Sequence, residues 1–192
     1  MVERMQMVRN QHGVTLIEVM VVIAIVGLMA GIAMPSYLSW KPGYVYRGAV
    51  SRIRGDINRA KMKAVETRNQ WRIMFCGSGY QLIEGDRPRN SRWTVPPAHT
   101  ANPSCPMNAA DLAAFQAAGR QVIIRNLAKF PQVQLAADCN SSPTAIASGA
   151  EPWFTFSPRG IANANGTVSV YLGSSGECST FSISTAGRIL RQ

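Results

Sequence analysis

The sequence has few of the residues that enzymes use for acid–base, nucleophilic or metal chemistry. It contains two histidines, His12 and His99, and ten scattered Asp and Glu side chains among 192 residues. No two of its four cysteines form a CxxC pair, and no glycine-rich phosphate loop is present. A lone histidine such as His99, in a proline-rich stretch, is usually just solvent-exposed. We therefore expect the protein to have no catalytic residue, no metal site and no cofactor, and we do not expect it to be an enzyme.

Acidic residues are outnumbered two to one by basic residues. Twenty Lys and Arg side chains against ten Asp and Glu give a formal net charge of +10. Such an excess favours an acidic partner, which could be anionic lipid, nucleic acid or an acidic protein surface. Charge alone does not choose among these three.

Charge is nearly missing from residues 14–34, VTLIEVMVVIAIVGLMAGIAM, where Glu18 is the one charged residue. As a helix this stretch would span roughly 30 Å, enough to cross a bilayer. The residues before this stretch include two arginines, Arg4 and Arg9, and one acid, Glu3. This excess of positive charge predicts a cytoplasmic N-terminus and an exported remainder. A secretory signal would have a shorter apolar core with a small-residue cleavage site after it. An ordinary anchor would avoid an acid near its start.

This N-terminal stretch resembles the class III signal of type IV pilins and type II secretion pseudopilins. In that family a prepilin peptidase cuts after a glycine and methylates the new N-terminus. The resemblance implies that Gly13 ends a cleaved leader, residues 1–13, and that Val14 becomes the methylated first residue. Most members have Phe where this chain has Val14. Gly27 and Pro35 also match, as a helix-softening glycine and a proline expected to kink the helix.

Glu18 matches the acid that the family has at the fifth mature position, with Thr15, Leu16 and Ile17 between. Cleavage would leave an amine beside a membrane segment, and an uncompensated charge there costs at least several kcal/mol. A carboxylate one turn along a neighbouring subunit's helix can neutralise the amine and fix the stagger of assembly. The simpler alternative is that Glu18 only reaches out to the membrane interface.

The remaining chain predicts an α+β fold, with a long kinked helix packed on a C-terminal antiparallel β domain. We expect a membrane-spanning or filament-core helix over residues 14–36, an amphipathic helix over 37–70 and a periplasmic β-rich domain over 71–192. In the amphipathic helix, apolar residues spaced three and four apart form one seam: Val50, Ile53, Ile57, Ala60 and Ala64. Basic residues flank the seam, either as a solvated face or as contacts for acidic filament neighbours or phosphates.

Strand patterns follow the helix. WRIMFCG and GYQLIEG alternate around Gly77-Ser78-Gly79 and predict a β-hairpin. Residues 108–119 predict a short helix with Asn108 as N-cap and Gly119 as terminator. RQVIIRNL, FPQVQLAADC, PWFTF, GTVSVYLG and ECSTFSIS predict further strands, and Asn165-Gly166-Thr167 predicts a hairpin turn.

The helix and both ends of the globular part resemble the GspH/FimT branch of minor pilins. The matching segments are AVSRIRGDINRAKMKAV, the F-x-P-x-G turn in FTFSPRGIAN, and the final strand with its GR in FSISTAGRIL. Some FimT proteins bind DNA through a C-terminal G-R-x-R element. Here the tail gives Arg188 and Arg191, so the second arginine comes one residue late. On a strand the two would point to opposite faces, which weakens a DNA-binding role.

Cys76, Cys105, Cys139 and Cys178 all follow the apolar segment. An even count in an exported chain predicts disulfides, with three possible pairings, although buried free thiols remain the alternative.

These observations predict a minor pilin-like subunit of a type IV pilus. Its expected location is the bacterial inner membrane, with the C-terminal domain in the periplasm, and then the filament. Its expected partners are prepilin peptidase and other pilins or pseudopilins. The alternatives are the minor pseudopilin H of type II secretion and a DNA-binding minor pilin for natural transformation.

Overall fold

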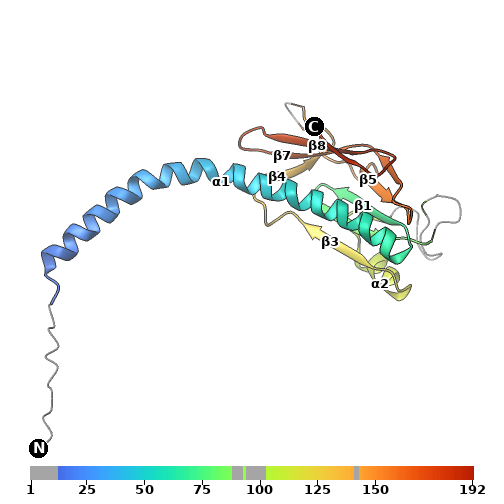
Figure 1. Ribbon diagram of the computed structural model, residues 1–192, viewed down its shortest axis with the longest axis horizontal. Helices are drawn as coiled ribbons and strands as arrows, with labels where there is room; N and C mark the ends of the chain where they lie inside the picture. Colours follow the sequence, from blue (N-terminus) through green and yellow to red (C-terminus); the bar gives the residue numbers. More distant parts are fainter. Residues whose placement is uncertain (1–12, 88–92, 94–102, 141–142) are drawn as a thin grey trace, which may run out of the picture. The chain divides into compact units, whose positions relative to one another are not determined.

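The computed structural model describes residues 13–87, 93, 103–140 and 143–192. Helix α1 (Leu16–Thr67) opens this part of the chain (Figure 1). The chain divides into two compact units, Met1–Lys41 and Pro42–Gln192, so that α1 belongs to both. In the first unit all described residues are exposed, including every apolar side chain of residues 14–40. This stretch of helix therefore has no packing partner within its own unit.

The helix continues through both of its prolines. Pro35 and Pro42 each lack a backbone N–H, yet the residues on either side of them are helical. A kink at Pro35 remains a prediction, and the helix does not end at Pro42.

In the second unit, α1 contributes the seam that its sequence predicts. The buried helix residues recur at three- and four-residue spacing: Tyr46, Ala49, Val50, Ile53, Asp56, Ile57, Ala60 and Ala64. Three of the eight are alanines, whose small side chains allow the helix to lie close to the strands beneath it. The expected α+β class, with a long N-terminal helix on an antiparallel β domain, is confirmed.

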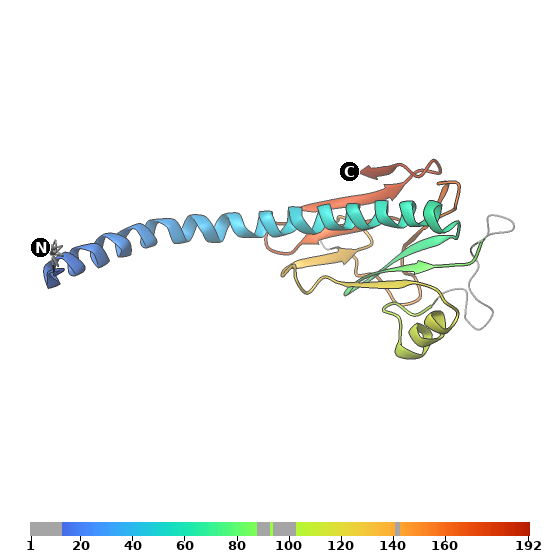
Figure 2. The ribbon, with the colours of Figure 1, turned by 60° about the horizontal axis from the view of Figure 1, so that its bottom comes forward.

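The strands form two antiparallel sheets rather than one (Figures 1 and 2). The five-stranded sheet has the order β3-β2-β1-β5-β6. Its strands are β1 (Trp71–Cys76), β2 (Gly79–Glu84), β3 (Val122–Asn126), β5 (Trp153–Phe156) and β6 (Ala162–Asn165). The four-stranded sheet has the order β4-β7-β8-β9. Its strands are β4 (Val133–Ala136), β7 (Val168–Leu172), β8 (Cys178–Ile183) and β9 (Ile189–Arg191).

One hydrophobic core joins α1 to both sheets. Trp71 and Phe154 of the first sheet and Val170 and Phe181 of the second belong to the same buried cluster as Ile53 of the helix. Since the helix seam is shared in this way, truncating a core side chain should loosen both sheets. Burial of a side chain of this size contributes roughly 1.5–3 kcal/mol.

The β1–β2 hairpin forms as predicted, but its expected alternation of buried and exposed residues is wrong. All twelve residues of the two strands are buried. One face packs on α1, and the other is covered by a second cluster that includes Ile83, Met107 and Phe115. Phe115 belongs to α2 (Ala109–Ala117), which begins at the predicted N-cap, where Asn108 accepts a hydrogen bond from the backbone N–H of Asp111. Covering both faces removes the period-two exposure of a half-buried strand.

The predicted hairpin turn at residues 165–167 is also wrong. β6 pairs with β5, whereas β7 pairs with β4 and β8. Gly166, with φ +81°, lies where the chain passes from one sheet to the other. A short glycine turn between two strand patterns does not by itself reveal whether the strands pair with each other.

Candidate functional site: the helix N-terminus, the disulfides and the C-terminal turns

The predicted processing site lies immediately before α1. Gly13 and Val14 are exposed and non-helical, and the helix begins two residues after Val14. The backbone N–H of Glu18 approaches both the Thr15 carbonyl oxygen, at 3.1 Å, and the Thr15 hydroxyl oxygen, at 3.4 Å. Thr15 is therefore the N-cap, and Thr15-x-x-Glu18 has the spacing of a capping box. Our sequence interpretation missed this role, although the T-x-x-E pattern could have revealed it.

The Glu18 carboxylate is exposed in the first helical turn. An acid there interacts favourably with the helix dipole by about 0.3–1 kcal/mol. Among the described residues, no basic side chain forms an ion pair with it. The carboxylate is thus placed where a cation from another molecule could approach it.

α1 is one helix whose length and composition suffice to cross a membrane. Its apolar window contains no buried residue, so the core of the second unit does not account for its composition. Together with its place after Gly13 and Val14, this supports membrane anchoring.

The structure contains two disulfides. Cys76 pairs with Cys105 and Cys139 pairs with Cys178, so the free-thiol alternative fails and one of three pairings is selected. The first bond joins the end of β1 to the segment that leads into α2, and Cys76 is 3% exposed. The second joins the segment after β4 to the start of β8, with Cys139 exposed.

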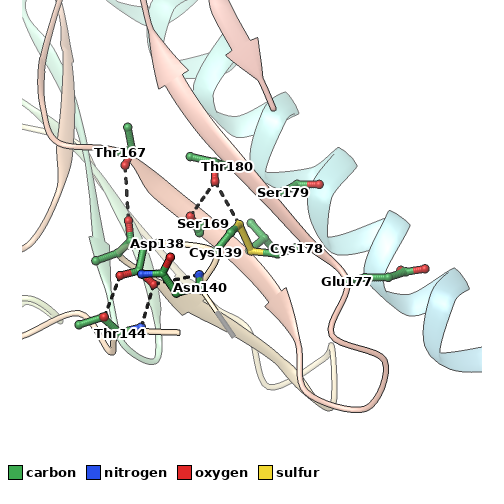
Figure 3. Close-up of a disulfide and its surroundings, with 12 residues drawn as sticks. Asp138, Cys139, Asn140, Thr144, Thr167, Ser169, Glu177, Cys178, Ser179 and Thr180 are labelled. Carbon is green, nitrogen blue, oxygen red and sulfur yellow. Dashed lines mark hydrogen bonds between the residues drawn. A yellow bond between two sulfur atoms is a disulfide. The ribbon is translucent and has the colours of Figure 1, made fainter. Parts of the chain in front are cut away.

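Hydrogen bonds surround the exposed disulfide (Figure 3). The Thr180 hydroxyl lies 3.1 Å from Cys139 Sγ and 2.9 Å from Ser169 Oγ. On the adjoining loop, Asp138 accepts hydrogen bonds from the Thr144 hydroxyl and backbone N–H. The Thr144 hydroxyl, followed by its backbone N–H, holds the pKa of the Asp138 carboxyl below its usual value. This region is a loop stapled by a disulfide, in which Asp138 and Thr144 hydrogen-bond to each other.

The two C-terminal signature segments meet over α1. Gly187 has φ +68°, and a Cβ at this position would lie 2.6 Å from the Gly160 carbonyl oxygen. Lys61 donates from Nζ to the Gly187 carbonyl oxygen at 3.1 Å. The turn between β5 and β6 therefore touches the turn between β8 and β9, with a helix lysine beside both. Their separation in the chain hides this contact from the sequence.

The structure gives the two candidate DNA-binding arginines different surroundings. Arg188 is exposed in the β8–β9 turn, next to Gly187, while Arg159 is exposed next to Gly160. Arg191 donates from Nε to Ser179 Oγ at 3.1 Å, and this oxygen also accepts a hydrogen bond from Tyr46 at 2.7 Å. The contact between the turns places Arg188 with Lys61 and Arg159, whereas Arg191 is attached to the sheet.

Two buried polar groups position the domain. Asp56 accepts hydrogen bonds from the Tyr80 hydroxyl, at 2.7 Å, and from Arg125 Nε, at 3.3 Å, and so ties α1 to β2 and β3. Burial, followed by the hydrogen bond to Asp56, raises the pKa of Tyr80. On the opposite sheet face, Arg72 lies between two tryptophan rings. Its guanidinium carbon is 4.2 Å from the centroid of the Trp93 ring and 3.9 Å from that of the Trp153 ring. Burial lowers the pKa of Arg72 to about 9, so it stays protonated at neutral pH.

No group of three metal-ligating side chains occurs within the described ranges, and His99 falls outside them. The geometry thus presents a capped apolar helix, a disulfide-stapled β domain and a basic pair of turns.

Comparisons with known proteins match both halves of this arrangement. Residues 8–34 match the family described as "Prokaryotic N-terminal methylation motif", and residues 49–187 match "Type II transport protein GspH". The chain belongs to the GspH family. Because the GspH domain follows the methylation motif, the chain is a minor pilin or pseudopilin, as its sequence predicted. Pilin and GspH families are structural subunits rather than enzymes.

Similar curated proteins are type IV pilins. The chain is 35% identical over 81 residues to a type IV major fimbrial protein FimA of Dichelobacter nodosus, covering 40% of this chain and 49% of that protein. It is 41% identical over 51 residues to a type IV major alpha-pilin of Moraxella bovis, covering 27% and 30%. The chain thus spans half or less of the length of these relatives. No solved structure matches it.

Proposed function

We propose that this chain is the precursor of a minor subunit of a type IV pilus, built into the filament through its N-terminal helix. The observation that carries the proposal is the methylation motif at residues 8–34, placed directly before a capped apolar helix and a GspH domain. Exposure of the whole apolar stretch supports it further, because side chains such as Leu28 and Ile32 need either lipid or neighbouring helices around them.

Processing is the first step. Prepilin peptidase cuts between Gly13 and Val14 and methylates the Val14 amine. The exposed, non-helical backbone on both sides of this bond supports access by a peptidase. Before cleavage the apolar helix holds the chain in the inner membrane, with the disulfide-bonded domain in the periplasm. Two disulfides fit an oxidising compartment.

Assembly is the second step. The Glu18 carboxylate of one subunit pairs with the Val14 amine of its neighbour as the helices pack side by side. In an apolar filament core an unpaired charge costs several kcal/mol, so one stagger of the helices is strongly favoured. Glu18 also sits at the third helical position, where capping fixes the backbone that carries it.

The family name and the relatives point to different machines. The domain is described as a type II transport protein, while the relatives are fimbrial subunits of pili. Deletion of the gene followed by complementation would separate the two. A pilus subunit restores surface filaments and leaves protein secretion unchanged, whereas a pseudopilin restores secretion of exported proteins and leaves filaments unchanged.

A second candidate function, DNA binding during uptake, is favoured by the cations gathered at the two turns. Arg188, Arg159 and Lys61 come from three elements held together at Gly187 and Gly160. The test is titration of the purified full chain with duplex DNA at rising salt. The plot of log affinity against log salt has a negative slope, and each lost phosphate contact should reduce the magnitude of that slope by about 0.9. Arg188→Ala and Arg159→Ala should weaken binding, and Arg87→Ala, an exposed control, should not.

A further inference from the structure

The exposed side of α1 in the second unit carries a ridge of solvent-facing residues opposite the buried seam. Its members recur at three- and four-residue spacing and thus share one face. They are Arg47, Ser51, Arg54, Asn58, Met62 and Val65, all exposed. We call this set the exposed ridge. Met62 and Val65 are 63% and 53% exposed, although both are apolar.

Three cations on the flanks of the helix, Arg52, Lys61 and Lys63, have partners within the chain. Arg52 lies over the Phe130 ring at 5.8 Å, Lys61 donates to Gly187, and Lys63 pairs with Glu66 at 3.1 Å. With the described part of the chain, Arg47 and Arg54 form no hydrogen bond, ion pair or ring contact. The fold therefore uses these three cations and leaves the ridge arginines available to another molecule.

A glycine beside the ridge adds to this contrast. Gly55 lies mid-helix, where glycine is less favourable than alanine. A Cβ at Gly55 would meet no atom within 4 Å, so packing within this chain does not require the glycine. Its absence of a side chain lets an outside surface come close to the helix backbone between Arg54 and Asn58.

We infer that the exposed ridge docks on a neighbouring subunit of a different kind, one that presents carboxylates to Arg47 and Arg54. The inference rests on the proposed function, since it needs a filament. A second copy of this chain would bring the same net charge of +10 and repel it. A nucleic-acid backbone would satisfy the arginines but would leave Met62 and Val65 against phosphate oxygens and water. An acidic protein surface can use both kinds of side chain.

The test compares two charge reversals of the full chain in its native host. Arg47→Glu/Arg54→Glu alters the ridge. Arg87→Glu/Lys129→Glu applies the same change in net charge at exposed positions outside the ridge. The membrane-bound and sheared-filament fractions are quantified for each variant, and equal membrane levels with both disulfides formed show that the variants fold. A photoreactive residue at Asn58 identifies the peptide that faces the ridge in assembled filaments.

Like charges across an interface cost several kcal/mol, so the ridge reversal should reduce the amount in filaments at least about tenfold. The control should match the wild type, and the Asn58 cross-link should fall on a different subunit, in a peptide that contains Asp or Glu. Normal recovery of Arg47→Glu/Arg54→Glu would overturn the inference, as would a cross-link to a second copy. Loss of duplex DNA binding with normal recovery would assign the ridge to nucleic acid. Absence of the wild type from filaments would instead refute the proposed function, and the inference about the ridge would then fail because it needs a filament.

Discussion

At the residue scale, we expect assembly to depend on the Glu18 carboxylate. Replacing it with alanine removes the carboxylate but leaves Thr15 to cap the helix. We expect Glu18→Ala to be cleaved after Gly13 as in the wild type and to be strongly reduced in sheared filaments. Processing is measured by mass and incorporation by quantitative blotting. Glu177→Ala, which removes an exposed loop carboxylate, serves as the control. Recovery of Glu18→Ala at the control level would show that the carboxylate has no pairing role.

Gly187 is the residue on which the contact between the two turns depends. A Cβ there would lie 2.6 Å from the Gly160 carbonyl oxygen, and the backbone is left-handed. Gly176 has a similar φ of +71° but open space around it. Both alanine variants incur the left-handed strain of roughly 1–2 kcal/mol. Because of the clash, Gly187→Ala should lower the free energy of unfolding by about 1–3 kcal/mol more than Gly176→Ala does. Thermal unfolding of both variants measures this difference. Equal losses for the two variants would mean that the turns do not press together.

At the element scale, hydrogen bonds to the buried Asp56 carboxylate join α1 to β2 and β3. Asp56→Asn leaves Arg125 without its carboxylate, and we expect a loss of about 1–3 kcal/mol in the free energy of unfolding. Glu66→Gln on the same helix alters an exposed ion pair and should cost less than about 1 kcal/mol. Denaturant unfolding followed by tryptophan fluorescence measures both. If Asp56→Asn cost no more than Glu66→Gln, this anchoring role would be refuted.

The two disulfides should differ in their access to reductant. Cys139 is exposed, whereas Cys76, at the end of β1, is 3% exposed. Under mild reduction without denaturant, followed by alkylation and peptide mass spectrometry, Cys139 and Cys178 should be labelled first, since exchange requires access to sulfur. Full denaturation should abolish the difference. Earlier labelling of Cys76 and Cys105 would contradict the burial seen here.

The elements predicted from sequence are those with strong local signals. The seam Val50, Ile53, Ile57 is periodic, and Asn108 precedes its helix as a capping residue should. Elements that depend on distant partners were misjudged. The β1–β2 strands are covered on both faces by residues far away in the chain, and Gly166 joins strands of different sheets. Neither fact is encoded within the segment itself.

The same division holds for the candidate site. Gly13, Val14 and Glu18 stand in one short motif and could be proposed from sequence alone. The grouping of Lys61 with the Gly160 and Gly187 turns required the fold, because the three segments are remote in the chain. The sequence motif in the tail suggested Arg191 as a DNA-binding residue beside Arg188. The contact between the turns suggests Arg159 in its place.

At the scale of the whole molecule, the chain combines two parts that need different surroundings. The apolar helix needs lipid or other apolar helices around it, whereas the basic, disulfide-bonded β domain needs water. A precursor that is first held in a membrane and then built into a filament accounts for both. We therefore expect the chain to exist in filaments as a cleaved and methylated protein.

Peptide mass spectrometry of the chain recovered from sheared filaments of its native host would show whether it does. We expect an N-terminal peptide that begins at Val14 and carries a methyl group on its amine. A chain that still begins at Met1, or that is missing from the filament fraction while abundant in membranes, would contradict this expectation.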